Sequence, residues 1–108
     1  MRIRKLHDWD LTPAQAIALQ KELAGRVEGR TPLTHCRLIA GADVSYARFG
    51  RSFFGGVVVL RAEDLSIVEQ QSAQRDSAFP YVPGLLSFRE APVLLDAFRK
   101  LSVQPDVV

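Results

Sequence analysis

Two carboxylates in this chain, Asp43 and Glu90, have settings in which they could hold a metal ion. Asp43 lies in the middle of a predicted strand, and its neighbours on the same face are Gly41 and Ser45. Aspartate forms strands poorly, and a carboxylate at such a position needs a reason. Small neighbours leave room for a hydrated cation and a phosphate. Asp43 is therefore either a metal ligand on a rigid element or a surface residue near the strand end.

Glu90 has a competing explanation as a helix cap. The segment Ser87-Phe88-Arg89-Glu90 matches a capping box, in which Glu90 accepts a hydrogen bond from the Ser87 amide. Both roles use the same carboxylate, although one oxygen can serve each. Taken alone, Glu90 is explained by the cap, and only its relation to Asp43 favours a metal-binding role.

A stiff loop with an aromatic residue near its tip precedes this helix start. Pro80 and Pro83 lie on either side of Tyr81 and Val82. Proline fixes its own φ and biases the preceding residue towards extended conformations, so the Tyr81 ring is presented with little freedom. A rigid, exposed ring beside a carboxylate suits a protein that opens nucleic acid and then hydrolyses its backbone.

Capping residues predict two helices around these sites. Thr12 caps the first helix, Pro13 takes its first position, Gln15 closes a capping box, and Gly29 is the predicted stop. Ser87 opens the second helix. Its apolar residues recur on one side: Val93, Leu94, Ala97, Phe98 and Leu101.

Three strands are predicted between the helices, at 37–46, 52–61 and 65–74, and the short turns between them favour an antiparallel meander. Residues 105–108 begin a further strand, which would return beside the first. This order is the opening half of an α/β, ribonuclease H-like fold. In that fold, carboxylates on the first strand and the following helix approach each other and the next strand supplies a third. Such clusters bind Mg²⁺ and drive in-line phosphodiester hydrolysis.

The composition indicates the class of protein but not its activity. The 108 residues are 47% apolar and 24% charged, with a net charge of +2. These values predict one soluble domain over 1–108, in the cytoplasm, with no membrane partner and with phosphate binding permitted but not required. Cys36 is the single cysteine, which excludes an intrachain disulfide, and adjacent His35 would point to the opposite strand face.

The strand predicted at residues 105–108 has only three or four residues, and a natural chain is not expected to end there. We therefore expect the chain to be a fragment of a longer domain. The first strand would then keep an unpaired edge, which could pair with a second copy of the chain.

Two stretches of the chain resemble the endonuclease V family of deoxyinosine-directed repair nucleases. They are Ile39-Ala40-Gly41-Ala42-Asp43-Val44-Ser45-Tyr46 and Phe79-Pro80-Tyr81-Val82-Pro83-Gly84-Leu85-Leu86-Ser87-Phe88-Arg89-Glu90. The likeness extends through the leading helix and the strand start at Pro105-Asp106. It covers nearly the whole chain, but only the amino-terminal half of the family's domain.

The resemblance implies an enzyme that recognises hypoxanthine in DNA, and in some members RNA, and hydrolyses the second phosphodiester 3′ to the lesion. It implies Mg²⁺ as cofactor, with Mn²⁺ as substitute. Asp43 and Glu90 match the first two metal-binding catalytic carboxylates. Four residues match the wedge that separates the strands at the lesion: Pro80, Tyr81, Val82 and Pro83. The next two, Gly84 and Leu85, match the backbone around the pocket that receives the base.

The family's third acidic ligand lies past Val108, as do a lysine and a histidine of its site. We therefore expect this polypeptide alone to be inactive. A noncatalytic nucleic-acid-binding or interaction domain with the same fold is the alternative hypothesis. Among other candidates, Tyr46 is expected to pack on the apolar face, Arg89 to be a solvated residue at the helix start, and His7 and His35 to have no metal role.

Overall fold

The apolar run in the middle of the chain forms the central strand of a sheet, and the other elements are arranged around it. The computed structural model describes residues 1–48 and 51–108. Its elements are α1 (Pro13–Ala24), β1 (Leu38–Tyr46), β2 (Ser52–Arg61), β3 (Ile67–Asp76) and α2 (Leu86–Arg99). The strands pair antiparallel in the order β1-β2-β3, which confirms the predicted meander.

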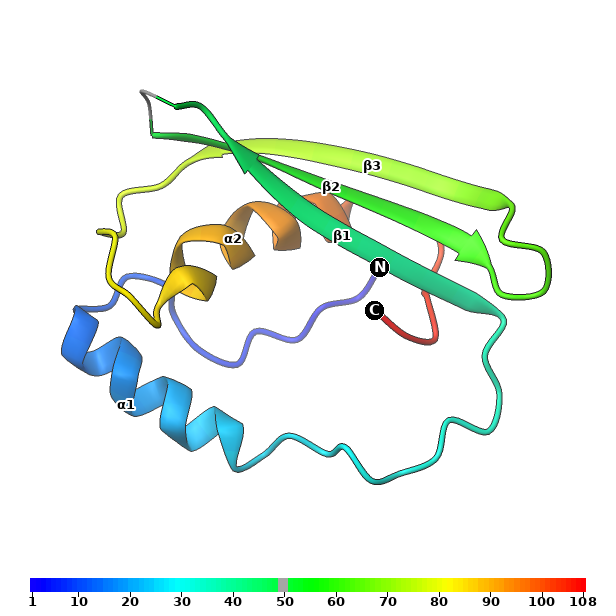
Figure 1. Ribbon diagram of the computed structural model, residues 1–108, viewed down its shortest axis with the longest axis horizontal. Helices are drawn as coiled ribbons and strands as arrows, with labels where there is room; N and C mark the ends of the chain where they lie inside the picture. Colours follow the sequence, from blue (N-terminus) through cyan, green and yellow to red (C-terminus); the bar gives the residue numbers. More distant parts are fainter. Residues whose placement is uncertain (49–50) are drawn as a thin grey trace.

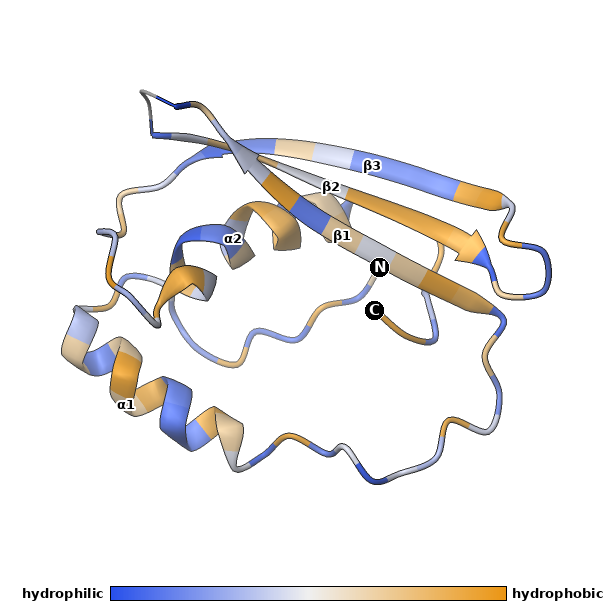
Figure 2. Ribbon diagram, in the orientation of Figure 1, coloured by the Kyte–Doolittle hydropathy of each residue, from blue (hydrophilic) through white to orange (hydrophobic). Residues whose placement is uncertain are grey.

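The sheet, α2 and α1 follow one another as layers (Figure 1). Strand alternation turns Phe53, Val57 and Val59 of β2 towards α2, and all three are buried. Ala97 and Leu101 pack against the two valines from the other side. Figure 2 shows the apolar character of β2 beside the largely polar β3, which lies at an edge of the sheet as expected.

A second cluster joins α1 to the first turn of α2. Ala16, Leu85 and Phe88 are its buried members, and Trp9 and Phe79 pack around them. Phe88 lies on the side of α2 away from the sheet, so this cluster fixes the helix from behind. The start of α2 is therefore held between two apolar layers.

A glycine allows α2 to lie close to the sheet. A Cβ atom on Gly55 would lie 3.0 Å from the Val93 carbonyl oxygen, 3.1 Å from its carbon and 3.3 Å from the Leu94 nitrogen. Gly55 pairs with Val44 of β1, so this contact sets the distance between α2 and the sheet next to that residue. Backbone atoms cannot rotate away as a side chain can, so a larger residue would have to displace the helix.

Gly55→Ala is expected to destabilise the fold by about 1–3 kcal/mol, the usual cost of overpacking a tight contact. Gly56→Ala is the matched control, because no described atom lies within 4 Å of a Cβ built there. That variant is expected to be neutral or slightly stabilising, since alanine has less backbone freedom to lose. Urea unfolding of the two variants measures the difference, and equal midpoints would contradict the close contact.

Several element ends differ from the sequence prediction: α1 ends earlier, β1 begins one residue later, and β3 both begins and ends two residues later. Helix α1 has the predicted capping box, with Gln15 N donating to Thr12 Oγ1 at 3.3 Å and Thr12 N to Gln15 Oε1 at 2.9 Å. It ends at Ala24, with Gly25 as its cap, rather than at Gly29. The cap amide already bonds within the last turn, and the chain then leaves in an extended path towards β1.

Strand β3 begins two residues later than predicted, because the preceding turn is longer. Leu65 has a φ of 59° and lies in that turn, while Asp64 accepts hydrogen bonds from the amide and hydroxyl of Ser66. An aspartate that bonds two residues ahead closes a turn of this kind, and it keeps Leu65 out of the ladder.

The C-terminal segment returns beside β1, as the sequence predicted. Val107 forms a parallel bridge with Ile39, and Ala40 N donates to the Val107 carbonyl at 2.8 Å. The Asp106 carboxylate accepts hydrogen bonds from the Arg37 and Leu38 amides at 2.8 and 2.9 Å. One aspartate therefore fixes where this segment meets the start of β1.

Two carboxylates that hold loops in place make the fold sensitive to acid. The bond from Gln71 and those from the Ser102 and Val103 amides lower the pKa of Glu69, and the Leu38 and Arg37 amides lower that of Asp106. A lowered folded-state pKa means that the stabilisation is complete above the unfolded pKa and is lost as pH falls through the folded value.

The free energy of unfolding is therefore expected to fall as the pH drops below about 4. Glu69→Gln should flatten this acid limb, whereas Glu63→Gln, in the β2–β3 turn, should leave its slope unchanged. Urea titrations between neutral pH and the acid limit give the comparison. Parallel curves for the wild type and Glu69→Gln would contradict the role of Glu69.

Among the helices of the described residues, none combines the length and the apolar content needed to cross a membrane.

Candidate active site

Asp43 lies over an open part of the sheet surface. Its side chain is exposed, and its partner across the ladder is Gly56. A Cβ atom built on either Gly41 or Gly56 would meet no described atom within 4 Å. The open space that the sequence predicted beside Asp43 is therefore present, because its neighbours along and across the strands have no bulk.

The carboxylate of Asp43 is turned towards the edge of β1 that faces away from β2. Asp43 Oδ1 accepts a hydrogen bond from Val44 N at 2.8 Å. In an antiparallel strand, amides two residues apart point to the same side, and the Ala40 amide bonds Val107 on the outer edge. The Val44 amide therefore points outward too, and it brings the carboxylate to that edge.

Glu90 is not a helix cap, which corrects the sequence prediction. Helix α2 begins at Leu86, its N-cap is Leu85, and no described side chain caps it. Ser87 is thus already inside the helix. The reason is the preceding turn, in which Leu85 N donates to the Val82 carbonyl at 3.0 Å and Phe88 N to the Leu85 carbonyl at 3.1 Å. The competing explanation for Glu90 is removed.

Glu90 lies on the side of α2 that faces β1. It precedes Leu94, Ala97 and Leu101 at helical spacing, and those residues belong to the core around Ala40 of β1 or pack against it. The Glu90 side chain is half-buried. The predicted approach of this carboxylate to Asp43 stays a prediction.

Asp43 and Glu90 can each be placed relative to the close contact between β2 and α2. Val44 pairs with Gly55, and Gly55 lies against the Val93 carbonyl. Glu90 precedes Val93 by three residues, which is about 4.5 Å along a helix axis. Glu90 therefore lies on the Phe53 side of this contact, next to Arg89, whereas Asp43 pairs with Gly56 on its other side.

Two carboxylates with open space beside them fit the oxygen ligands that Mg²⁺ prefers. The described residues hold no group of three or more histidine, cysteine, aspartate or glutamate side chains that could bind a metal ion together. These two residues therefore offer an incomplete set of protein ligands, in which water or further oxygen ligands must complete the coordination.

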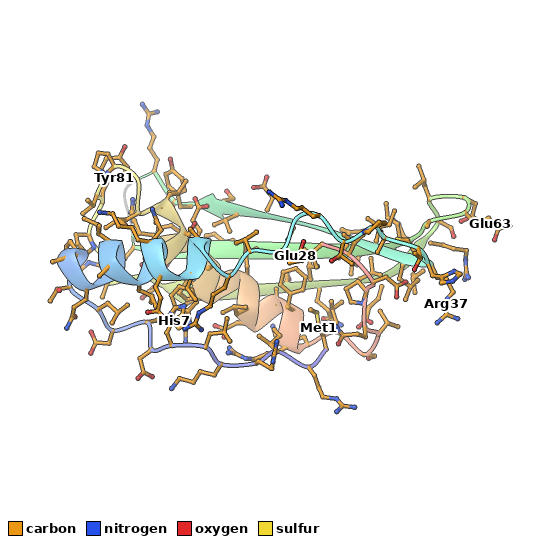
Figure 3. The ribbon with its side chains drawn as sticks, turned by 90° about the horizontal axis from the view of Figure 1, so that it is seen from below. Met1, His7, Glu28, Arg37, Glu63 and Tyr81 are labelled. Carbon is orange, nitrogen blue, oxygen red and sulfur yellow. The ribbon has the colours of Figure 1, made fainter. Side chains whose placement is uncertain are left out.

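The loop before α2 is anchored by its apolar residues and presents its tyrosine. Phe79 stacks on Phe88 with ring centroids 5.6 Å apart, and Val82 packs against the same cluster. Leu85 is 2% exposed, whereas Tyr81 is 73% exposed. Figure 3 shows Tyr81 at the end of the molecule opposite to Arg37 and Glu63.

A tight turn connects this loop to the helix. Pro83 and Gly84 are its central residues, and Gly84 has a φ of 85°. Proline followed by a residue with positive φ is the pattern of a type II turn, which favours glycine at the second of these positions. The loop thus has a defined path on both sides of Tyr81.

The structure corrects two predictions for residues near this loop. Arg89 is half-buried rather than solvated, with its Cζ atom 5.2 Å from the Phe53 ring centroid and 5.6 Å from that of Tyr81. Tyr46 contacts Phe53 at 5.8 Å between centroids but remains 61% exposed, so it packs only by one side. Sequence reasoning missed Phe53, because only the fold brings this strand residue next to Arg89.

Comparisons with known proteins agree on one family. The family model described as Endonuclease V matches residues 21–108. An endonuclease V of Dehalococcoides mccartyi is 46% identical over 108 residues, covering 100% of this chain and 48% of that protein. The chain thus spans about half the length of the curated relatives it matches.

Solved structures give the same result. Endonuclease V from Streptomyces avermitilis superimposes with a TM-score of 0.84 at 37% identity, over 92% of this chain and 45% of that one. A Ciona intestinalis endonuclease V, solved in complex with a 24mer DNA containing an inosine followed by a ribo-adenosine, has a TM-score of 0.68 at 23% identity, over 80% and 38% of the two chains. The second likeness shows the fold alone.

The observed α/β arrangement, with its antiparallel meander, helix and returning segment, is that of the ribonuclease H-like endonuclease V structures. The family model covers most of the chain, including both stretches on which the resemblance was based. The chain therefore belongs to the endonuclease V family.

Proposed function

We propose that this chain supplies the lesion-opening wedge and two metal-binding carboxylates of a nuclease that acts at hypoxanthine in DNA. The proposal includes hydrolysis of the second phosphodiester 3′ to the lesion, and RNA containing inosine as a further substrate. The observation that carries it is the place of Glu90 on the β1 side of α2, in the helix that directly follows the loop presenting Tyr81, together with the exposed Asp43 on β1.

Each group in this arrangement has a distinct task. Asp43 and Glu90 hold Mg²⁺, or Mn²⁺ in its place. When bound, the metal supplies activation of water and stabilisation of charge on the phosphate oxygens. Gly41 and Gly56 leave the surface beside Asp43 open to a phosphodiester. Tyr81 enters the stack where a base has been turned out, and its two flanking prolines limit the entropy lost on binding.

The positions of Gly84 and Leu85 support their proposed part in the base pocket. Gly84 is exposed and Leu85 is buried directly behind it. A backbone without a side chain lets a flat base approach closely, while the buried leucine keeps that backbone in place.

A fusion protein tests the nuclease proposal. Residues 1–108 would replace the matching half of the Dehalococcoides mccartyi endonuclease V, and the product would be assayed on a duplex with one inosine. We expect metal-dependent cleavage by the fusion and none by the 108-residue chain alone, because two carboxylates cannot fully orient the metal and the phosphodiester. An inactive but well-folded fusion, or cleavage at undamaged sites only, would contradict the proposal.

A noncatalytic nucleic-acid-binding domain is the second candidate, favoured by the incomplete ligand set of the described residues. A Mn²⁺ titration of the 108-residue chain helps to separate the candidates. Weak binding that needs both carboxylates agrees with half of a nuclease site. Binding that is unchanged without them agrees with the noncatalytic candidate.

We also propose that two copies of the isolated chain can pair through the outer edge of β1. In the described residues this edge is bridged at Ile39, and the strand extends seven residues beyond it, to Tyr46. Sedimentation equilibrium should show a dimer that Val44→Pro abolishes, because proline removes the outward amide. A monomer at every concentration would contradict the pairing.

A further inference from the structure

Arg89 lies between an aromatic ring of the sheet and the aromatic ring of the loop. Its Cζ atom is 5.2 Å from the centroid of Phe53, which is 2% exposed, and 5.6 Å from the centroid of Tyr81, which is 73% exposed. Guanidinium groups are attracted to ring faces at such distances. These three side chains, the Phe53–Arg89–Tyr81 column, connect the core to the exposed ring of the loop.

Contacts with aromatic rings, rather than hydrogen bonds, hold the buried part of the Arg89 side chain around Nε. Its Nε atom is buried and has no hydrogen-bond partner within the described residues. A buried donor that remains unpaired is unfavourable, so the side chain would turn to solvent unless other contacts outweighed that cost. The two ring faces are the contacts that can do so.

The loop needs such support at its tip. Pro80 and Pro83 restrict the backbone on either side of Tyr81, but they do not restrict rotation of the Tyr81 side chain. Behind the loop lies a cleft of about 280 Å³ lined in part by Phe79, Pro80 and Arg89, so packed side chains do not fill the space there. Arg89 contacts the ring itself.

We propose that Arg89 is a positioning residue that fixes the orientation in which Tyr81 enters nucleic acid. It acts by stacking Tyr81 onto Phe53, and it is not a ligand of the phosphate backbone. This role rests on the proposed function of Tyr81. Because Arg89 adjoins Glu90 in α2, the same helical turn sets the orientation of the wedge and holds one metal-binding carboxylate.

The contact itself can be tested without nucleic acid. In ¹⁵N-edited NMR spectra, the Arg89 Nε–Hε signal should be shifted by the two ring currents and slow to exchange with water. Tyr81→Leu should move this signal markedly, whereas Tyr46→Leu should move it much less, because Tyr46 touches only the far member of the column. A signal that does not respond to Tyr81→Leu would overturn the proposal.

The positioning role is tested by a double-mutant cycle in the fluorescence anisotropy of the chain with duplexes that contain or lack one inosine. Arg89→Met keeps the apolar stem and removes the guanidinium. We expect it to reduce the preference for the inosine duplex about three- to tenfold, in line with the strength of a partly buried cation–π contact. In a Tyr81→Leu background the same change should cost less than about twofold, because the ring on which it acts is gone.

Salt dependence separates positioning from phosphate binding. Loss of a phosphate contact lowers the slope of log K against log salt by about 1 and weakens binding to both duplexes alike. We expect an unchanged slope for Arg89→Met. Equal losses on both duplexes with a reduced slope would overturn the proposal and make Arg89 a phosphate ligand.

Arg89→Lys provides a second variant if Arg89→Met does not fold. Lysine keeps the charge but lacks the planar group that stacks on two rings, so it should not restore the preference for inosine. Full restoration by lysine would overturn the stacking mechanism. A wild-type chain without any preference for the inosine duplex would refute the proposed function of Tyr81, and the NMR result would still decide whether the column exists.

Discussion

Replacing Asp43 with asparagine is expected to reduce cleavage of an inosine-containing duplex by the fusion protein about 10²- to 10³-fold or more. Loss of a single charge-stabilising group in an active site has an effect of this size. Asparagine has the same shape, and its oxygen can still accept the hydrogen bond from Val44 N, so the strand should remain intact. Glu90→Gln should have a comparable effect, because both carboxylates are proposed to hold the same metal ion.

Metal binding gives a readout that does not depend on cleavage. Even the loss of groups outside the inner coordination sphere commonly weakens metal binding 10–100-fold, so either substitution should weaken Mn²⁺ binding to the chain at least about tenfold. Glu63→Gln is the control, because it removes one carboxylate from the β2–β3 turn, at the end of the molecule opposite to Tyr81 (Figure 3). Normal cleavage by Asp43→Asn would refute its assignment as a metal ligand.

Tyr81→Ala is expected to weaken binding to the inosine duplex about 5- to 150-fold, the range that corresponds to the loss of one base–aromatic stack. Binding to undamaged duplex should change far less, since no base is turned out there. Tyr81 is 73% exposed, so its removal should alter the free energy of unfolding by no more than about 0.5 kcal/mol. Anisotropy titrations with the two duplexes measure the difference.

Tyr81→Phe is the matched variant, because it removes the hydroxyl and keeps the ring. It should retain most of the preference for inosine if stacking is what Tyr81 contributes. Equal losses on damaged and undamaged duplexes for Tyr81→Ala would show that the ring makes a general contact rather than acting as a wedge.

Local chemistry made several elements predictable from sequence. The Thr12 capping box and the bounds of β2 are as predicted, because a cap is formed by residues three apart and a central strand by one unbroken apolar run. The open surface beside Asp43 followed in the same way from small residues at alternate positions. These features depend on neighbours within a few residues.

The prediction of a capping box at Ser87 was wrong, and the reason is again local chemistry. The motif was present, but a turn ending at Leu85 started the helix earlier and left Ser87 inside it. Turn chemistry at Pro83 and Gly84 was therefore the stronger signal. With the cap excluded, Glu90 is available for other interactions, which the sequence had left open.

The sequence by itself determined the family and the order of the elements, and it singled out the two carboxylates and the tyrosine as proposed site residues, because these depend on residue types and short spacings. Only the tertiary structure decided that Asp43 turns to the outer edge of β1, that Glu90 lies on the side of α2 facing that strand, and that Arg89 lies between Phe53 and Tyr81. Strand register and the close approach of α2 at Gly55 set these relations, and they join residues tens of positions apart, which no local pattern specifies.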